Sequence, residues 1–362
     1  MVCIAAFIIL CLVGIIVAFI SIFKKEVGKK YLAIFKKAWH CVFKKVRLQK
    51  CDTNFKDDVK NTMLKKVILK HPKWVKPLSV TIEVVSVLIV AITVWSIVIA
   101  IKSLLALWVF GTCNVSKPSA CSLTSESCSI DAEEPHNIFE QIGQSIGEWG
   151  EIFGGIPDRL KTWNENDFSD LKNLPILNEV EEGTSYAELM QSNKKPAFDI
   201  MDPGCVVCMT SYRNQKSSGF MDSNMVYLVV YPIQSPDGSY RFKNSEIASK
   251  YIIATQINTA PEKNYVGKLI NKLFNGEDEK GVSFQTRLNN DWEEEDVIKI
   301  FSSWLKDFGV EEKDIKKIEE NLNSKEVEEA LAKNRDVVDN KIHAKSIPTL
   351  IYDGKKHAGL YK

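Results

Sequence analysis

Two cysteines separated by two valines, Cys205 and Cys208, constrain the fold of this chain more than any other feature. They follow a short apolar run at residues 196–201 and a turn-forming Asp-Pro-Gly at 202–204. This order predicts a β-strand, a tight turn and a helix whose first turn carries both thiols. Two thiols at this spacing can close and reopen a disulfide, and the positive end of the helix dipole favours the reactive thiolate. The segment therefore predicts an α/β domain capable of dithiol–disulfide exchange.

A second landmark lies near the end of the chain. Residues 346–352 and 357–361 are predicted to form a β-hairpin around Asp353 and Gly354. Pro348 lies near the start of its first strand, where a missing backbone donor is tolerated. An apolar strand is predicted at 225–233. Helical periodicity is present at residues 245–256, 261–274, 292–308, 313–321 and 324–344.

With these landmarks, residues 184–362 resemble the DsbA-like branch of the thioredoxin superfamily. In that family a helical insert separates the CxxC half from a cis-proline hairpin, and the cis-proline loop lies against the active-site disulfide. The resemblance implies a thioredoxin fold with a helical insert. It also implies that Cys205 is the exposed attacking thiol and that Cys208 is the shielded resolving thiol.

The resemblance further implies a cis peptide bond before Pro348, and an extended substrate bound by the neighbouring Ile347 and Thr349. It implies no cofactor apart from the redox-active disulfide itself. Asp199 lies six positions before Cys205, where related proteins often bury a carboxylate that exchanges protons with the second cysteine. Burial would raise the pKa of that carboxyl group and suit it to general-base work. The alternative is an ordinary polar residue on the open face of an edge strand.

Two departures from the family pattern affect the expected chemistry. The strongly oxidising members carry Pro-His between the cysteines, whereas this chain has Val206 and Val207, which supply neither a donor nor a charge. The disulfide is therefore expected to be less oxidising than in those members. The sequence also stops at Lys362, directly after the hairpin, whereas family members usually continue into a further helix.

The charge is distributed unevenly, although the net charge is only +1. Residues 24–77 contain sixteen lysines and one arginine against four acidic residues, a local net charge of +13 that leaves −12 for the rest. Apolar stretches flank this segment at 1–23 and 78–101, and each is long enough to cross a bilayer as a helix. The positive-inside rule places the basic segment in the cytoplasm, and the N-terminus and everything after Ile101 outside.

These features predict two transmembrane helices, 1–23 and 78–110 with its outer flank, joined by the cytoplasmic loop 24–77. The first stretch lacks a basic start and a clear cleavage site, so we interpret it as a retained anchor. Glu83 is interpreted as snorkelling to the surface or pairing with Lys76, with a proton relay as the alternative. Aromatic and aliphatic residues at helical spacing in the loop predict a cationic helix on the lipid bilayer rather than a nucleic-acid site.

Residues 111–183 are expected to form an extracytoplasmic stalk. It contains Cys113, Cys121 and Cys128, which allow one internal disulfide and leave one thiol that is free, intermolecular or resolving toward Cys205. Residues 136–153 predict an amphipathic helix, and 157–183 a polar linker. Beyond it, Ser185 and Glu188 form a predicted capping box of the domain.

Three functions fit this sequence. The first is a membrane-anchored oxidase that forms disulfides in exported proteins, reoxidised by a DsbB-like or vitamin-K-epoxide-reductase-like membrane partner. The second is a reductase or isomerase on the same fold. The third is a binding module in which the CxxC pair is a fixed structural bridge. A metal site is disfavoured, because no histidine lies at ligand spacing and no second CxxC occurs.

Overall fold

The computed structural model describes residues 32, 35–36, 39–40, 75–113, 115, 128–129, 138–171, 174–178, 188, 193–235 and 237–362. The chain divides into two compact units, Met1–Ile101 and Lys102–Lys362. The predicted membrane segment 1–23, nearly all of the basic loop and Ser185 of the predicted capping box lie outside the described residues. The five described residues between 32 and 40 are helical.

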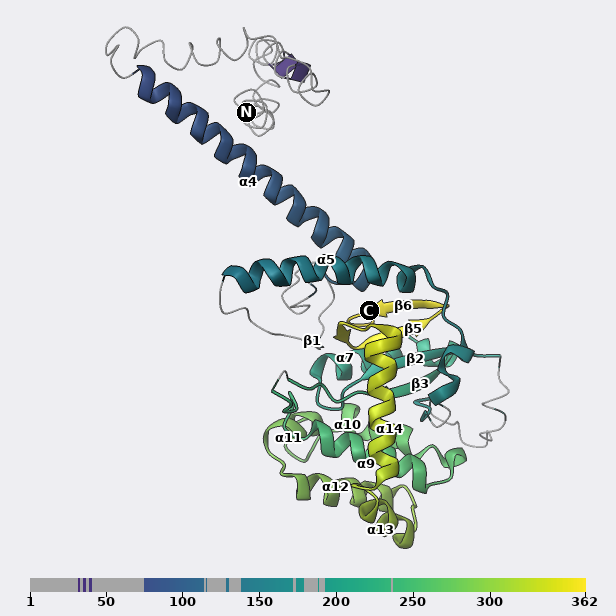
Figure 1. Cartoon of the computed structure of the whole chain (residues 1–362). Helices are drawn as coiled ribbons and strands as arrows, with labels where there is room; N and C mark the ends of the chain where they lie inside the picture. Colours follow the sequence, from purple (N-terminus) through teal and green to yellow (C-terminus); the bar gives the residue numbers. More distant parts are fainter. Residues whose placement is uncertain are drawn as a thin grey trace, which may run out of the picture. The chain divides into compact units, whose positions relative to one another are not determined.

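Helix α4, Val75–Phe110, contains the second predicted membrane span (Figure 1). Its 36 residues correspond to about 54 Å of helix, which exceeds the roughly 30 Å hydrocarbon core of a bilayer. Large apolar side chains are exposed along it, among them Leu88, Ile92 and Trp95. Within the part of the chain that the structure describes, α4 is the one helix long and apolar enough to cross a membrane.

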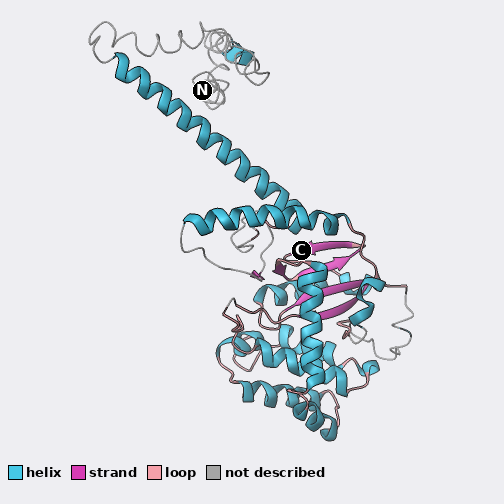
Figure 2. Cartoon of the chain, in the orientation of Figure 1, coloured by secondary structure: helices cyan, strands magenta, loops and turns pink. Residues whose placement is uncertain are grey.

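The second unit is built on a mixed four-stranded sheet with the order β3-β2-β5-β6 (Figure 2). Strand β2 (Lys195–Met201) is parallel to β3 (Asn224–Val230) and antiparallel to β5 (Thr349–Tyr352). The α/β prediction and the hairpin are confirmed. Strand β6 (Lys355–Ala358) begins earlier than predicted, because Asp353 and Gly354 both adopt positive φ angles, 48° and 71°, and make a two-residue turn.

A second, two-stranded sheet lies beside Pro348. Strand β1 (Cys128–Ser129) pairs antiparallel with β4 (Ser346–Ile347), with Cys128 opposite Ile347. Pro348 thus separates β4 from β5, and the single strand predicted at 346–352 is divided into two.

The predicted helices between the two halves of the sheet are all present. Asn264, with φ 45°, interrupts the predicted stretch 261–274, and its side chain accepts a hydrogen bond from the Gly267 N–H (3.1 Å) at the start of α10. In Figure 1 helices α9, α10, α12 and α13 lie beyond β3, on the opposite side of the sheet from β6, and α14 runs from this group back toward the strands. The helices between β2 and β4, in chain order, are α7 (Val206–Ser217), α8 (Phe220–Ser223), α9 (Ser245–Asn258), η4 (Pro261–Lys263), α10 (Tyr265–Asn275), α11 (Phe284–Asn290), α12 (Glu294–Asp307), α13 (Glu312–Glu320), α14 (Lys325–Asp336) and the π-helical η5 (Val337–Ile342). Of these, α8 and α11 were not predicted.

The prediction of a polar linker is wrong for the described part of 157–183. The 3-10 helix η3 (Glu165–Leu171) buries Phe168, and the ring centroids of Phe168 and Phe198 in β2 are 3.7 Å apart. Trp163 packs against Phe168. Leu177 is also buried. These apolar residues follow no regular period because irregular backbone carries them, so the pattern did not show them as core.

Helix α5 (Ile138–Leu160) extends the predicted amphipathic helix by about two turns. Its Ile152 packs with Ala106, Val109 and Phe110. Lys102 forms an ion pair with Glu148. Other apolar side chains of the helix are exposed: Ile146, Phe153 and Leu160.

Candidate active site

The CxxC pair lies at the N-terminus of α7, as predicted. Cys205 directly precedes the first helical residue, and its carbonyl accepts the N–H of Met209 at 3.1 Å. Cys208 lies in the first turn. The N–H of Cys205 donates to the Asp202 carbonyl (3.0 Å), which closes the turn between β2 and the helix. Strand, turn and helix thus hold both cysteines at the positive end of a helix dipole.

The unpredicted helix α11 holds this turn from outside. Gln285 Nε2 donates to the carbonyls of Pro203 and Cys205, both at 2.9 Å. Asn289 Nδ2 donates to the Gly204 carbonyl at 2.8 Å. These contacts satisfy buried backbone acceptors and fix the position of Cys205. Sequence reasoning missed both residues, because short α11 lies about 80 residues away and shows no marked apolar period.

The two cysteines have different redox states. Cys205 is disulfide-bonded, whereas Cys208 is a free, buried thiol. They are therefore not bonded to each other. Cys205 is 0% exposed, so the prediction of an exposed thiol is wrong for this state, in which its sulfur is already bonded and covered. The neighbouring Val206 is 53% exposed, and Cys208 is shielded as predicted.

Asp199 lies in the middle of β2, between Leu228 of β3 and Leu350 of β5. Its placement on the open face of an edge strand is therefore ruled out, and its side chain is buried. Oδ2 accepts a hydrogen bond from Gln215 Nε2 of α7 at 2.8 Å, and Oδ1 has no hydrogen-bond partner among the residues that the structure describes. Burial raises the pKa of Asp199 to about 7, and the hydrogen bond from Gln215 offsets part of the shift.

A second buried carboxylate, Asp202, completes the site. It accepts hydrogen bonds from the N–H groups of Gly204 (2.7 Å) and Ile233 (2.8 Å) and from the Ser245 hydroxyl. Burial raises the pKa of Asp202 to about 6, with these donors opposing the shift. Sequence reasoning treated Asp202 only as a turn former. The available signal was an acidic residue at the carboxyl end of an apolar strand, directly before the cysteines.

Both carboxylates act on Cys208. Burial raises the pKa of the Cys208 thiol well above its ordinary value, and the negative charges of Asp199 and Asp202 raise it further. The backbone N–H of Asp202 donates to the sulfur and opposes this shift. Cys208 is therefore a protonated thiol until a neighbouring base accepts its proton. Asp199 and Asp202 have pKa values of about 7 and 6 and lie close enough to influence it electrostatically.

The proline loop lies at the same end of the sheet. The Ile347–Pro348 bond is cis, as expected. Thr349 pairs with Ile200 in antiparallel β2, so the residues before Thr349 lie toward the end of β2 that leads to Cys205. The Thr349 hydroxyl donates to the Ser346 carbonyl (2.6 Å), and Gly359 N–H donates to the Pro348 carbonyl (2.8 Å). The substrate-binding role of Ile347 and Thr349 stays a prediction.

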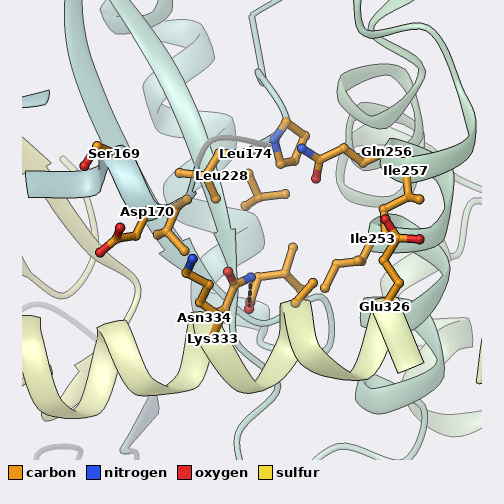
Figure 3. Close-up of a pocket in the computed structure, with 14 residues that line it drawn as sticks. Ser169, Asp170, Leu174, Leu228, Ile253, Gln256, Ile257, Glu326, Lys333 and Asn334 are labelled. Atoms are coloured by element: carbon orange, nitrogen blue, oxygen red, sulfur yellow. Dashed lines mark hydrogen bonds between the residues drawn. The ribbon is translucent and has the colours of Figure 1, made fainter. Parts of the chain in front are cut away.

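A separate cavity of about 470 Å³ lies between η3, β3, α9 and α14 (Figure 3). Leu228, Ile253 and Asn334 line it, and Asn334 Nδ2 donates to the Val230 carbonyl at 3.0 Å. Neither cysteine of the motif lines this cavity. Among the described residues, no group of three or more His, Cys, Asp or Glu side chains is arranged to hold a metal ion.

No family model and no curated protein matches this chain. Among solved structures it is similar to the MdbA protein, a thiol-disulfide oxidoreductase from Corynebacterium diphtheriae, with 16% identity and a TM-score of 0.36 over 54% of this chain and 87% of that one. It is also similar to the thiol-disulfide exchange protein alpha-DsbA2 from Wolbachia pipientis, with 15% identity and a TM-score of 0.34 over 54% and 88% of the two chains. A third similar structure is the oxidoreductase DsbA from Xylella fastidiosa, with 14% identity and a TM-score of 0.29 over 50% and 87%.

Proposed function

We propose that this chain is a membrane-anchored thiol–disulfide oxidoreductase that exchanges disulfides with proteins outside the cytoplasm. One observation carries the proposal: the two cysteines of the CxxC motif are in different redox states, Cys205 disulfide-bonded and Cys208 a buried thiol. This is the arrangement of a mixed-disulfide stage in thiol exchange. A permanent structural bridge between Cys205 and Cys208 is inconsistent with it.

In the proposed cycle, a substrate thiolate attacks the Cys205 sulfur of a Cys205–Cys208 disulfide. The new bond joins the substrate to Cys205, and Cys208 leaves as a thiolate that takes a proton from Asp199 or Asp202. A second substrate thiolate then attacks the substrate sulfur of the mixed disulfide. The substrate leaves oxidised and Cys205 leaves as a thiolate, which the helix N-terminus stabilises. The enzyme has gained the two electrons that the substrate lost.

We propose the oxidase direction, with reoxidation by a quinone-linked membrane protein of DsbB-like or vitamin-K-epoxide-reductase-like type. The apolar helix α4 supports anchoring, and the basic segment 24–77 supports a cytoplasmic loop with the second unit outside. An extracytoplasmic compartment also lets disulfides persist. A reductase or isomerase is the alternative, because Val206 and Val207 offer the thiolate of Cys205 no charge.

Single-cysteine variants test the proposal. Cys205→Ser should lose oxidation of a dithiol peptide by at least about 100-fold, because Cys205 is the cysteine proposed to form the mixed disulfide with the substrate. Cys208→Ser should accumulate mixed disulfides with protein partners, visible as bands that a reductant removes on gel electrophoresis, because the resolving thiol is absent. Equal activity of Cys205→Ser and the wild-type chain would contradict the proposal.

A further inference from the structure

The two-residue strand β1 places a stalk cysteine beside the active-site proline. Cys128 lies directly opposite Ile347 in the antiparallel β1–β4 pair. Directly opposed residues in such a pair have Cα atoms about 4.5–5.5 Å apart. Ile347 is the residue joined to Pro348 by the cis bond. The backbone of Cys128 is therefore held opposite the residue that directly precedes the active-site proline.

Strand β4 lies toward the end of β2 that leads to Cys205. Strand β2 runs through Ile200 and Met201 into the turn that carries Cys205, and Ile200 is opposite Thr349. Because β2 and β5 are antiparallel, Pro348 and Ile347 continue toward that turn. Edge addition of an extended segment is a common way for a sheet to bind a peptide, through backbone hydrogen bonds. Here the chain's own residues Cys128–Ser129 pair with β4 in this way.

The redox state of the site requires another cysteine. Cys205 is disulfide-bonded while Cys208 is free, so the bond partner of Cys205 lies outside the CxxC motif. Ser346 and Ile347 on the paired strand are buried, as is Cys205. The register of β1 brings Cys128 to this buried edge.

We propose that Cys128 is a third redox-active cysteine, which enters the active site as an internal substrate and forms a mixed disulfide with Cys205. The inference rests on the proposed function and deepens it, because it identifies a peptide segment, Cys128–Ser129, that binds to β4 beside the active-site proline. The ligand that β4 binds is an extended peptide with a cysteine opposite Ile347. In the proposed resting state, the stalk residues Cys128–Ser129 are that peptide.

The exchange needs no external oxidant. The Cys208 thiol gives its proton to Asp199 or Asp202, and the Cys208 thiolate attacks the Cys205 sulfur. The Cys205–Cys128 bond breaks while a Cys205–Cys208 bond forms, and Cys128 leaves as a thiolate that takes up a proton. The number of disulfides is unchanged. The Cys205–Cys128 disulfide therefore stores the oxidising equivalent, and the Cys205–Cys208 disulfide presents it to external thiols.

Disulfide mapping of the full-length protein in detergent tests the bond directly. After alkylation of free thiols without reductant, cleavage after glutamate releases residues 127–133, which contain Cys128 but neither Cys113 nor Cys121. This peptide should be linked to the peptide that carries Cys205, and Cys208→Ser should raise the linked fraction because the resolving thiol is removed. Recovery of 127–133 as an alkylated peptide, or linked to Cys113 or Cys121, would overturn the inference.

Activity provides a second, independent readout. A tethered thiol acts at an effective concentration on the order of millimolar, so it outcompetes micromolar substrates. Cys128→Ser should therefore oxidise a dithiol peptide about tenfold faster than the wild-type chain. The control is the double variant Cys113→Ser/Cys121→Ser, which removes the other stalk cysteines and should stay within about twofold of wild type. A Cys128→Ser rate equal to that of the control would overturn the internal-substrate role.

The two proposals fail separately. If Cys205→Ser oxidises the peptide as fast as wild type while mapping still links Cys128 to Cys205, the bond stands and the proposed enzymatic function fails. If Cys205→Ser is inactive while mapping finds another partner for Cys205, the function stands and the role of Cys128 fails.

Discussion

At the scale of single residues, the site is defined by two carboxyl groups buried beneath one thiol. Asp199 lies within β2 and Asp202 directly follows that strand, and burial raises both pKa values, to about 7 and about 6. Gln215 is the partner of Asp199, whereas three donors, from Gly204, Ile233 and Ser245, hold Asp202. Asp199 is therefore the freer of the two to change its protonation state when Cys208 gains or loses a proton.

The raised pKa of Asp199 predicts a pH-dependent stability. Between its ordinary pKa of 3.8 and its folded value of about 7, the folded state binds a proton that the unfolded state releases. The free energy of unfolding should therefore fall as the pH rises through this window, by up to about 4 kcal/mol for this group. Asp199→Asn should lose that part of the dependence, and should be more stable than wild type at pH 8 in urea denaturation.

A matched control is Asp307→Asn, which changes an exposed carboxylate at the end of α12. Its stability should follow the wild-type pH profile. Parallel profiles for Asp199→Asn and wild type between pH 4 and pH 8 would contradict the account of the buried carboxylate.

At the scale of elements, the position of Cys205 depends on a turn that two distant segments hold. Gly204 allows the approach: a Cβ there would lie 2.5 Å from the Cβ of Phe242 and 3.0 Å from Asn289 Oδ1. Gln285 and Asn289 of α11 then bind the turn's carbonyl groups. The turn is thus fixed mainly by contacts from outside the CxxC segment.

This arrangement predicts that Gly204→Ala destabilises the domain by about 1–3 kcal/mol, the usual cost of overpacking. It should also slow peptide oxidation, because the turn and Cys205 must shift together. The control, Gly154→Ala in α5, adds a methyl group where no atom lies within 4 Å, and should be neutral or stabilising by up to about 1 kcal/mol. Urea midpoints would measure both, and an equal effect of the two substitutions would contradict the packing argument.

Local patterns predicted the elements of the site well. The apolar run before Asp202, the two cysteines and the Asp-Gly turn each determine structure within a few residues, so β2, α7 and the hairpin appear where expected. The contribution of Gln285 could not be predicted, because it depends on contacts across about 80 residues. Trp163 and Phe168 were missed for a related reason: η3 packs them without a helix or strand period.

At the scale of the whole molecule, a long apolar helix precedes a unit with its own core. Helix α4 exposes apolar side chains along its length, while the unit from Lys102 onward buries a large apolar cluster around the sheet. Full-length protein should therefore remain in the membrane fraction after alkaline carbonate extraction, because α4 is anchored by burial of apolar surface. A chain beginning at Lys102 should be released. Extraction of the full-length protein by carbonate would contradict membrane anchoring.

A redox titration of the whole protein would show whether Cys205 is redox-active. Full-length protein in detergent would be equilibrated in glutathione and dithiothreitol buffers, and free Cys205 would be counted by alkylation and mass spectrometry. We expect a reversible transition with a midpoint between about −120 and −270 mV, the range of redox-active disulfides. For an oxidase or isomerase, the midpoint should lie between about −120 and −180 mV. A Cys205 that stays oxidised to potentials below about −300 mV would behave as a structural disulfide and would contradict the account.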